Sequence, residues 1–372
     1  DGGFVSDVDY IRVINEEYSE NPQNFQPTVS LSVEAGPSPV VITVSDDTAP
    51  GDEGSIIVGQ PAVFGNSLGF AAIRLDYGAQ IISRNSAYYD AGSGTVVGGY
   101  QNVRIGDGAR GAISVNGNGS ALLAYGNGAR ITVGASGQQV GALDIYDGAR
   151  VGTLSVFVGN NTDGRLNIGA ANSELNINDT YGQYGGALDT VAGGLTVGVN
   201  GGDGEVRVAE GGTITVSNTD GVTDAPFVNV GRDVGSTGQI EVYGRDTTLN
   251  ITQNGDATAG GAFLGIGRDG AATVSVDYGE INVTGDNALI TVAHELNPGD
   301  DTRSGQLNIA SGGSVTINSG DGEGGGLVVG QSANTGATVT VDGIGSLLSV
   351  VSDAGAVQSY GAFITVGREG DG

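Results

Sequence analysis

One sequence motif recurs along this chain: an alternating apolar strand closed by glycine, followed by two more short alternating strands. From residue 195 it reads LTVG, GEVRV and GTITV, and from residue 228 it reads VNVG, GQIEV and TTLNI. The closing residue recurs at intervals of about 26 to 39 residues, within the range typical of solenoid repeats. A fold of stacked coils is therefore predicted. The closing residues are Gly159, Gly198, Gly231, Gly267, Ala293, Gly330 and Gly367.

The alternation within each strand predicts which side chains are buried. Val206 and Val208 flank the polar Arg207, and this period of two is typical of a half-buried strand. The next strands repeat the pattern with Ile214 and Val216 around Thr215, and with Ile240 and Val242 around Glu241. Because one coil cannot bury its own apolar face, the neighbouring coils must cover it. We therefore predict an all-β fold, a single-stranded parallel β-helix.

Two regions are predicted. Residues 55–372 form the β-helix, with about nine coils and an incomplete last one, and with three strands per coil from Gly159 onward. The coil register over 95–159 and the handedness stay open. Residues 1–54 lack this sequence motif but contain alternating stretches at 10–18, 28–36 and 40–47. We expect a small N-terminal β cap or module there, joined by an acidic hinge at 45–54.

The connections between the strands differ in length. The turns after the first and second strands read as short and uniform, whereas the return from the third strand to the next first strand varies. Variation at one corner of each coil predicts loops along one edge of the rod, often a binding edge. The longest loop contains Tyr181 and Tyr184, which are either exposed contacts for sugar or protein or anchors packed on the coil.

The composition excludes several classes of function. Glycine supplies 70 of 372 residues without a collagen period, and the formal net charge is −28. So acidic a surface repels phosphate backbones, so no nucleic-acid partner is expected. The apolar runs are too short for a membrane span, so we expect no membrane insertion by this segment. Cysteine is absent, which excludes disulfides and thiolate metal sites.

The acidic hinge is the candidate metal site. Asp46, Asp47, Asp52 and Glu53 gather around a Pro-Gly bend, and hard cations such as Ca²⁺ prefer oxygen ligands. Two interpretations stay open: a calcium site, which would make Ca²⁺ a cofactor, or a solvated acidic linker.

The densest mixture of acids and bases is the segment 293–305. His294 and Glu295 follow the strand-closing Ala293, at the positions that Arg232 and Asp233 occupy in another coil. A recurring pair at this position favours an exposed ion-pair ladder over a single active site. We therefore predict that the chain is not an enzyme. The segment also contains Asp300, Asp301 and Arg303, and the ladder continues with Arg268, Asp269, Arg368 and Glu369.

Both ends of the chain carry candidate association segments. Phe363, Ile364 and Val366 form an apolar strand without the two strands that complete its coil. An uncovered strand edge is a template for another strand. We expect end-to-end self-association in which Tyr10, Ile11 and Val13 of the next copy supply the pairing strand. The alternative is that the chain's own continuation completes the coil.

The repeated pattern V-x-V-G, G-x-[VI]-x-[VI], G-x-x-[ILV]-x-[VI], with acidic glycine-rich turns, resembles bacterial autotransporter passengers and large secreted repeat adhesins over residues 55–372. The resemblance implies secretion, a right-handed β-helix, and adhesion or self-association. We predict an extracellular or cell-surface structural β-solenoid, the stalk of an adhesin or a subunit of a surface filament or layer, facing a host or polysaccharide surface. The alternatives are a polysaccharide lyase or hydrolase on the same scaffold and a calcium-dependent binding module.

Overall fold

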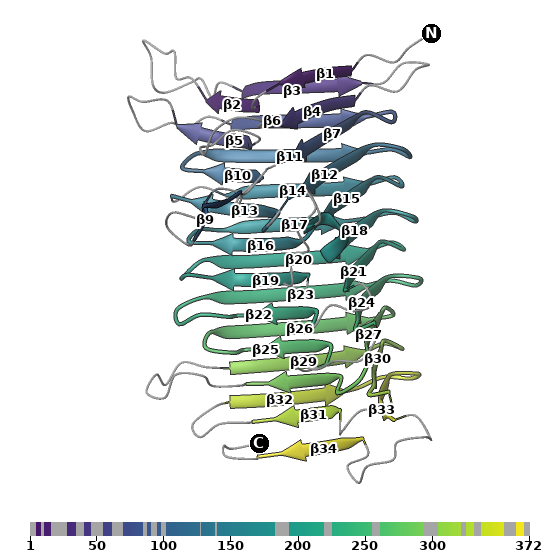
Figure 1. Cartoon of the computed structure of the whole chain (residues 1–372). Helices are drawn as coiled ribbons and strands as arrows, with labels where there is room; N and C mark the ends of the chain where they lie inside the picture. The colour runs from purple at the N-terminus through teal and green to yellow at the C-terminus, as the bar shows by residue number, and fades with distance from the viewer. Residues whose placement is uncertain are drawn as a thin grey trace, which may run out of the picture.

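The computed structural model describes residues 5–8, 11–15, 28–34, 41–45, 55–61, 70–84, 88–90, 95–97, 102–126, 128–137, 140–182, 193–218, 225–254, 261–293, 304–320, 325–330, 336–352 and 362–367. The chain winds through three parallel sheets in a fixed order, one strand per sheet in each coil (Figure 1). We call them sheets A, B and C. The prediction of a parallel β-helix is confirmed.

Sheet A has eleven strands: β1 (Val5–Val8), β4 (Val41–Ser45), β7 (Gln80–Arg84), β12 (Ala121–Tyr125), β15 (Arg150–Thr153), β18 (Glu174–Asn178), β21 (Thr213–Ser217), β24 (Thr248–Thr252), β27 (Glu280–Thr284), β30 (Ser314–Asn318) and β33 (Leu347–Val351). Sheet B also has eleven: β2 (Ile11–Asn15), β5 (Ile56–Pro61), β10 (Val103–Asp107), β13 (Arg130–Ser136), β16 (Ser155–Asn160), β19 (Gly194–Val199), β22 (Phe227–Val230), β25 (Phe263–Ile266), β28 (Leu289–Val292), β31 (Gly326–Val329) and β34 (Phe363–Val366).

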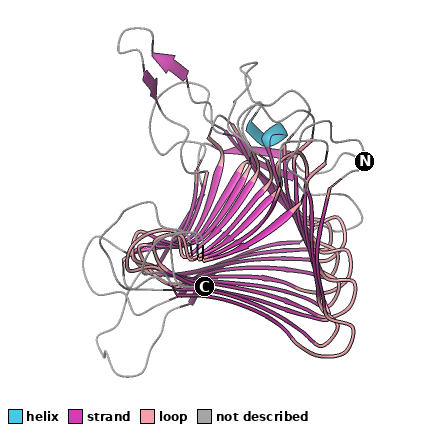
Figure 2. Ribbon diagram, turned by 90° about the horizontal axis from the view of Figure 1, so that it is seen from below, coloured by secondary structure: helices cyan, strands magenta, loops and turns pink. Residues whose placement is uncertain are grey.

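Sheet C has ten strands: β3 (Thr28–Glu34), β6 (Phe70–Asp76), β11 (Arg110–Asn116), β14 (Gly141–Tyr146), β17 (Gly164–Ile168), β20 (Asp203–Ala209), β23 (Thr237–Tyr243), β26 (Ala271–Asp277), β29 (Ser304–Ala310) and β32 (Gly336–Val341). A small antiparallel hairpin, β8 (Tyr88–Asp90) and β9 (Thr95–Val97), stands away from the stack (Figure 2). Among the described residues, the helical structure is limited to the 3₁₀ turn η1 (Asp179–Gly182).

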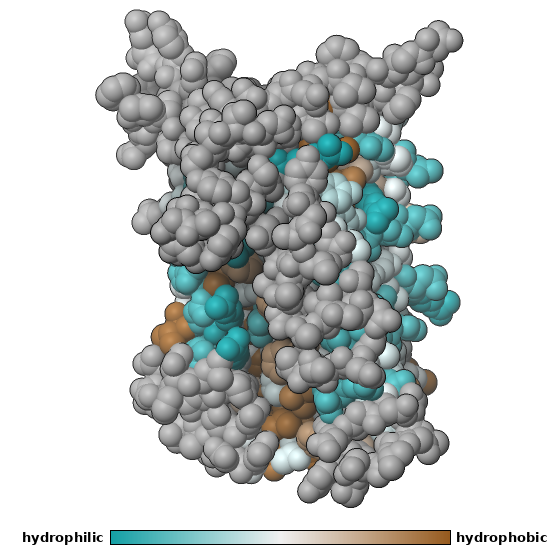
Figure 3. Space-filling view, viewed as in Figure 1, coloured by the Kyte–Doolittle hydropathy of each residue, from teal (hydrophilic) through white to brown (hydrophobic). Residues whose placement is uncertain are grey.

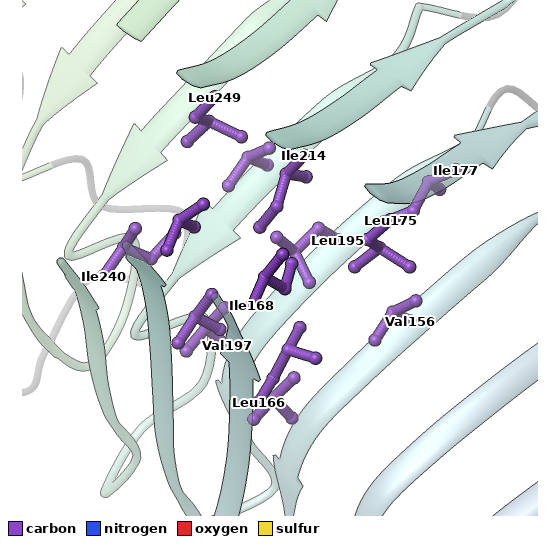
Figure 4. Close-up of a cluster of buried hydrophobic side chains, with 14 of the residues drawn as sticks. Val156, Leu166, Ile168, Leu175, Ile177, Leu195, Val197, Ile214, Ile240 and Leu249 are labelled. Atoms are coloured by element: carbon purple, nitrogen blue, oxygen red, sulfur yellow. The ribbon is translucent and has the colours of Figure 1, made fainter. Parts of the chain in front are cut away.

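The core is a set of apolar ladders that run along the axis of the stack. Val206 pairs with Ile240 and Val208 with Val242 in sheet C, and all four side chains are fully buried, as predicted. The inward side chains of all three sheets meet at the axis (Figure 4), where each large aliphatic residue contributes roughly 1.5–3 kcal/mol of burial free energy.

The structure settles the register over 95–159. Strands β10 to β16 belong in turn to sheets B, C, A, B, C, A and B. Gly106, Gly134 and Gly159, all with positive φ, close the successive sheet B strands. These coils are shorter than most of the later ones because their connections are short. Periodicity did not settle the register there because every strand-like stretch in that region alternates equally well.

The N-terminal strands extend the same stack. β1, β2 and β3 pair in parallel with β4, β5 and β6, and β4 pairs with β7. In the part that the structure describes, the segment predicted as a separate cap or module therefore continues the three sheets and forms no sheet of its own. Apolar and polar residues alternate in the same way in a strand of a cap and in a strand of a coil, so alternation does not distinguish the two.

The connections differ from their prediction at one corner. The turns from sheet C to sheet A, which we call the C–A corner, are short and alike (Figure 2), as predicted. The turns from sheet B to sheet C, the B–C corner, vary: β19 ends at Val199 and β20 begins at Asp203, whereas β28 ends at Val292 and β29 begins at Ser304. The prediction of uniform turns after the first strand was therefore wrong.

Candidate functional site

The outward face of sheet A carries rows of short polar side chains. Strands β18, β21, β24, β27 and β30 pair in register, which places Asn176, Thr215, Asn250, Asn282 and Thr316 in one row along the axis. Because side chains alternate across a strand, the polar residues face away from the apolar core. We call the outward residues of these five strands the polar face. Its flanking rows are Glu174, Thr213, Thr248, Glu280 and Ser314, and Asn178, Ser217, Thr252, Thr284 and Asn318.

Part of the polar face is bonded to itself. The Asn282 Nδ2 donates to Asn250 Oδ1 at 3.0 Å, and Asn178 Nδ2 donates to Ser217 Oγ at 2.8 Å. Thr248 Oγ1 also donates to Thr213 Oγ1 at 3.2 Å, and Asn176 Nδ2 donates to Glu174 Oε2 at 3.2 Å. Such bonds reinforce the main-chain ladders. The face therefore offers mainly amide and hydroxyl groups, with the carboxylates of Glu174 and Glu280 at its margin.

Arg150 separates two surface pockets beside the polar face. A pocket of about 420 Å³ is lined by Gln80, Asn118, Arg150 and Glu174, among others. A second pocket, of about 540 Å³, lies between Arg150 and residues that include Asn176 and Tyr181. The described lining is mostly amide and hydroxyl, so the chemistry it supports is hydrogen bonding to a polar ligand.

Tyr181 anchors the connection after β18. Its ring covers the outward face of Gly152, where a Cβ would overlap the ring atoms, and its hydroxyl accepts a hydrogen bond from Arg150 Nη2 at 3.1 Å. Tyr125 lies beside it, with ring centroids 5.1 Å apart. Burial is the largest effect that raises the pKa of Tyr181, and the nearby Arg150 opposes it. Of the two interpretations, Tyr181 is an anchor; Tyr184 lies outside the described residues.

The predicted association segments lie at opposite ends of sheet B. β2 and β34 are its outermost strands, with Ile11 and Val13 paired to Ile56 and Val58. At the other end, Ile364 is 57 % exposed and Val366 is 61 % exposed. Phe363 is half-buried and pairs with Gly326, whereas Tyr10 lies outside the described residues. Self-association through these segments stays a prediction.

The acidic hinge lies outside the described residues, including Asp46, Asp47, Asp52 and Glu53. Within the described ranges, no group of three or more His, Cys, Asp or Glu side chains is placed to hold a metal ion. Calcium binding at the hinge therefore stays a prediction, and melting curves recorded in calcium and in chelator test it.

One pair of the predicted ion-pair ladder, Arg232 and Asp233, is formed on the described part of the B–C corner, whereas Asp269 in the next coil is buried. Arg232 Nε lies 3.5 Å from Asp233 Oδ1, and Asp233 Oδ2 accepts a hydrogen bond from the Asn200 amide at 3.0 Å. Burial, and then repulsion from Arg232 in the neighbouring coil, lowers the pKa of Arg268. The segment from His294 to Arg303 lies outside the described residues, as do Arg368 and Glu369.

Comparisons with known proteins add little. No protein-family model and no curated protein matches the chain. Among solved structures, the TibC-catalysed hyper-glycosylated fragment of TibA aligns with 99 % of this chain and 99 % of its own, at 15 % identity and a TM-score of 0.18. A TM-score this low carries no argument, so the fold rests on the three sheets themselves. Among the described residues, no helix is long and apolar enough to cross a membrane.

Proposed function

We propose that this chain is an extracellular, non-catalytic structural β-solenoid that serves as the stalk of an adhesin or as a subunit of a surface filament or layer. The observation that supports this proposal is the continuity of the three sheets, which makes the described chain one rod about 48 Å long at the usual strand spacing. A stack of this kind holds its two ends apart and presents long faces between them.

The charge and the surface fit this role. A net charge of −28 keeps long rods apart in solution. The outward side of sheet C carries exposed pairs such as Arg165–Glu205 and Arg207–Glu241, both 3.4 Å apart. Exposed pairs of this kind contribute little stability, about 0–1 kcal/mol, and serve mainly as a solvated surface. The resemblance of the repeat to secreted adhesins adds the extracellular location to the proposal.

The role as a filament subunit rests on β34, the last described strand of sheet B, where Ile364 and Val366 are exposed. We expect β34 of one copy to pair with β2 of the next, which gives a head-to-tail contact that propagates. Electron microscopy and sedimentation of the full chain test this. The variant Ile364→Asp/Val366→Asp places charges on that edge and is expected to abolish filaments, as is deletion of residues 1–20.

A matched control is Val234→Asp, which adds a charge at a residue 45 % exposed on the B–C corner, away from both ends. Filaments lost in the edge variant and kept in the control support the subunit role. A rod that stays monomeric at every concentration supports the stalk role instead. Release of reducing sugar from a polysaccharide by the purified chain would contradict the non-catalytic proposal.

A further inference from the structure

Four exposed tyrosines follow one edge of the rod. Tyr77, Tyr146, Tyr243 and Tyr278 lie where sheet C strands end at the C–A corner, and their side chains are 72 %, 37 %, 41 % and 51 % exposed. We call them the tyrosine edge. Hydrophilic residues gather at this corner, at the right of the rod (Figure 3).

Two of these tyrosines occupy a backbone conformation that disfavours them. Tyr77 has φ 55° and Tyr278 has φ 58°, the left-handed region that glycine, Asn and Asp adopt most readily. At the same turn position as Tyr77, other coils carry Asp147, Glu210 and Ser311. The fold therefore does not require an aromatic residue there. A strained and exposed aromatic side chain that gains little burial points to a role in binding.

The other two tyrosines, Tyr146 and Tyr243, are the last residues of β14 and β23. Tyr146 lies over Gly169 of the next coil, with its Cδ1 atom 2.8 Å from where a Cβ would stand. Tyr243 and Tyr278 belong to adjacent strands joined by a backbone bridge. Sheet C spacing places Tyr77 and Tyr146 about 10 Å apart along the axis, and Tyr146 and Tyr243 about 14 Å apart.

The surroundings of the rings are polar and of mixed sign. The charges that act on Tyr146 come from Asp144 and Glu210, which raise the pKa of its phenol, and from Arg207, which lowers it, while burial is the largest effect. On the sheet A side of the same corner, Asn118 and Asn172 line the pocket beside Arg150 and Glu174. The edge therefore combines electron-rich ring faces with neutral amides and balanced charges.

We propose that the tyrosine edge binds a neutral polysaccharide chain that runs along the axis of the rod. This inference rests on the proposed adhesive function and names its ligand class. A sugar ring presents an apolar C–H face that stacks on an aromatic ring and a rim of hydroxyl groups that amides and carboxylates bind. The distance from Tyr77 to Tyr278, about 29 Å along the axis, suits an extended polymer.

Other partners fit the edge less well. A protein interface favours a contiguous cluster of aromatic anchors. Along this edge, intervening coils separate Tyr77, Tyr146 and the adjacent pair Tyr243 and Tyr278 from one another. An acidic polysaccharide is repelled by the net charge of −28.

Native affinity electrophoresis in gels containing mixed-linkage β-glucan tests the proposal on the full chain. The glucan is expected to retard the wild-type protein. The double variant Tyr77→Asn/Tyr278→Asn is expected to lose affinity by about tenfold. Its melting temperature is expected to stay the same or rise, because Asn tolerates the left-handed region better than Tyr. A binding loss without a stability loss separates recognition from folding.

Two further variants sharpen the result. Ser311→Asn makes the same kind of change at an equivalent turn without removing a ring, and its affinity is expected to stay within about twofold. Tyr77→Phe/Tyr278→Phe keeps both rings and is expected to bind within about threefold. If the Phe variant binds the glucan as weakly as the Asn variant does, the proposal that the rings stack on sugar is wrong.

Three other outcomes overturn the proposal: wild-type mobility unchanged by β-glucan, equal retardation by polygalacturonate, or binding unchanged in the Asn variant. Filament formation by the same proteins is scored in parallel. Loss of glucan binding with the rod and its filaments intact leaves the structural role standing. A failure of the proposed glucan binding can therefore be distinguished from a failure of the proposed structural role.

Discussion

The B–C and C–A corners turn the chain with the same left-handed backbone conformation but accept different residues. Every described sheet B strand from β5 to β34 is followed or closed by glycine or alanine with positive φ, from Gly59 to Gly367, and the one alanine is Ala293. The C–A corner places Tyr77, Asp147 and Glu210 in the same region of φ. The position that closes a sheet B strand is therefore restricted to glycine and alanine, whereas the first turn position at the C–A corner accepts larger residues. Further along the B–C corner, Asn161 and Asn200 also have positive φ.

Space explains the difference. A Cβ on Gly267 would stand 2.6 Å from the Ser304 carbonyl oxygen, because the next sheet C strand passes directly over the B–C corner. A Cβ on Gly148 at the C–A corner would meet nothing closer than 3.7 Å, at Asn118. Backbone packing therefore excludes larger side chains at the position that closes a sheet B strand, whereas the turn position of Gly148 has room for them. Each corner also holds a position of the other kind. A Cβ on Gly235 at the B–C corner would meet nothing within 4 Å, and one on Gly313 at the C–A corner would stand 2.5 Å from the Val276 carbonyl oxygen.

Hydrogen bonding distinguishes the position that closes a sheet B strand from the turns that use a hydroxyl acceptor. Such turns occur at both corners, since the Gly201 amide at the B–C corner donates to Ser236 Oγ at 3.0 Å. At the B–C corner the Gly267 amide donates to the Val230 carbonyl of the preceding coil at 2.8 Å. At the C–A corner a side-chain hydroxyl is the acceptor of a turn amide. Thr247 Oγ1 accepts from the Gly211 amide at 2.9 Å and donates to the Tyr243 carbonyl at 3.1 Å. Ser120, Ser173 and Ser346 accept in the same way from glycine amides of the preceding coil.

Gly267→Ala is expected to give the largest effect. It combines a left-handed φ of +70° with an overlap against the Ser304 backbone, and we expect a loss of about 3 kcal/mol in stability. Gly148→Ala, with φ +81° but open space, is expected to cost only about 1 kcal/mol. Urea unfolding of both variants measures the pair. Equal losses would mean that space does not separate the two corners.

Thr247→Val is expected to cost about 1–2 kcal/mol, because it replaces a buried hydroxyl and leaves the half-buried Gly211 amide without its acceptor. Thr215→Val, on the half-buried polar face, is the matched control and is expected to change stability by less than about 0.5 kcal/mol. Thermal melting compares them. A control that loses as much as Thr247→Val contradicts the role of the hydroxyl.

Tyr181→Phe extends the comparison to the corner after sheet A and is expected to cost about 1 kcal/mol, through its lost bond to Arg150. The folded pKa of Tyr181 is raised above the ordinary value of 10.0, so the neutral phenol adds stability below that pH. This stability is lost as the pH rises through the folded pKa. Melting temperatures above pH 10 should fall more steeply in the wild type than in the variant, and parallel curves would contradict the shift.

Ser311→Asn is expected to have the smallest effect, a gain of up to about 0.5 kcal/mol, because Asn is favoured in the left-handed region. Calorimetry measures the shift in melting temperature. A loss comparable to that of Gly267→Ala would show that the C–A corner is as restricted as the B–C corner.

The sequence predicted the features that depend on local pattern. The inward ladder of Val206, Val208, Ile240 and Val242 follows from alternation, and the closing glycines with Ala293 follow from the repeat. The polar face and the pockets beside Arg150 were missed, because they arise from pairing between coils that alternation does not specify. A row such as Thr215, Asn250 and Asn282 at matching outward positions is the signal by which the face could have been found.

The tyrosine edge was missed for a different reason. Tyr77 and Tyr278 each precede a glycine in a turn, and the sequence pattern gives no sign that their φ is positive. The variable B–C connection before Ser304 and the N-terminal strands that continue the stack depend likewise on tertiary pairing. The exposure and the positive φ of Tyr77 and Tyr278 are evident only from the structure.

Amide hydrogen exchange, resolved along the whole chain, tests the division between the corners most directly. The amides of Gly231, Gly267 and Gly330 at the B–C corner donate to the preceding coil, and we expect them to be protected as strongly as the strand centres. The C–A amides of Gly211 and Gly312, which rest on hydroxyl acceptors, should exchange faster. Faster exchange at Gly231, Gly267 and Gly330 than at Gly211 and Gly312 would contradict the conclusion that backbone packing fixes the position that closes a sheet B strand.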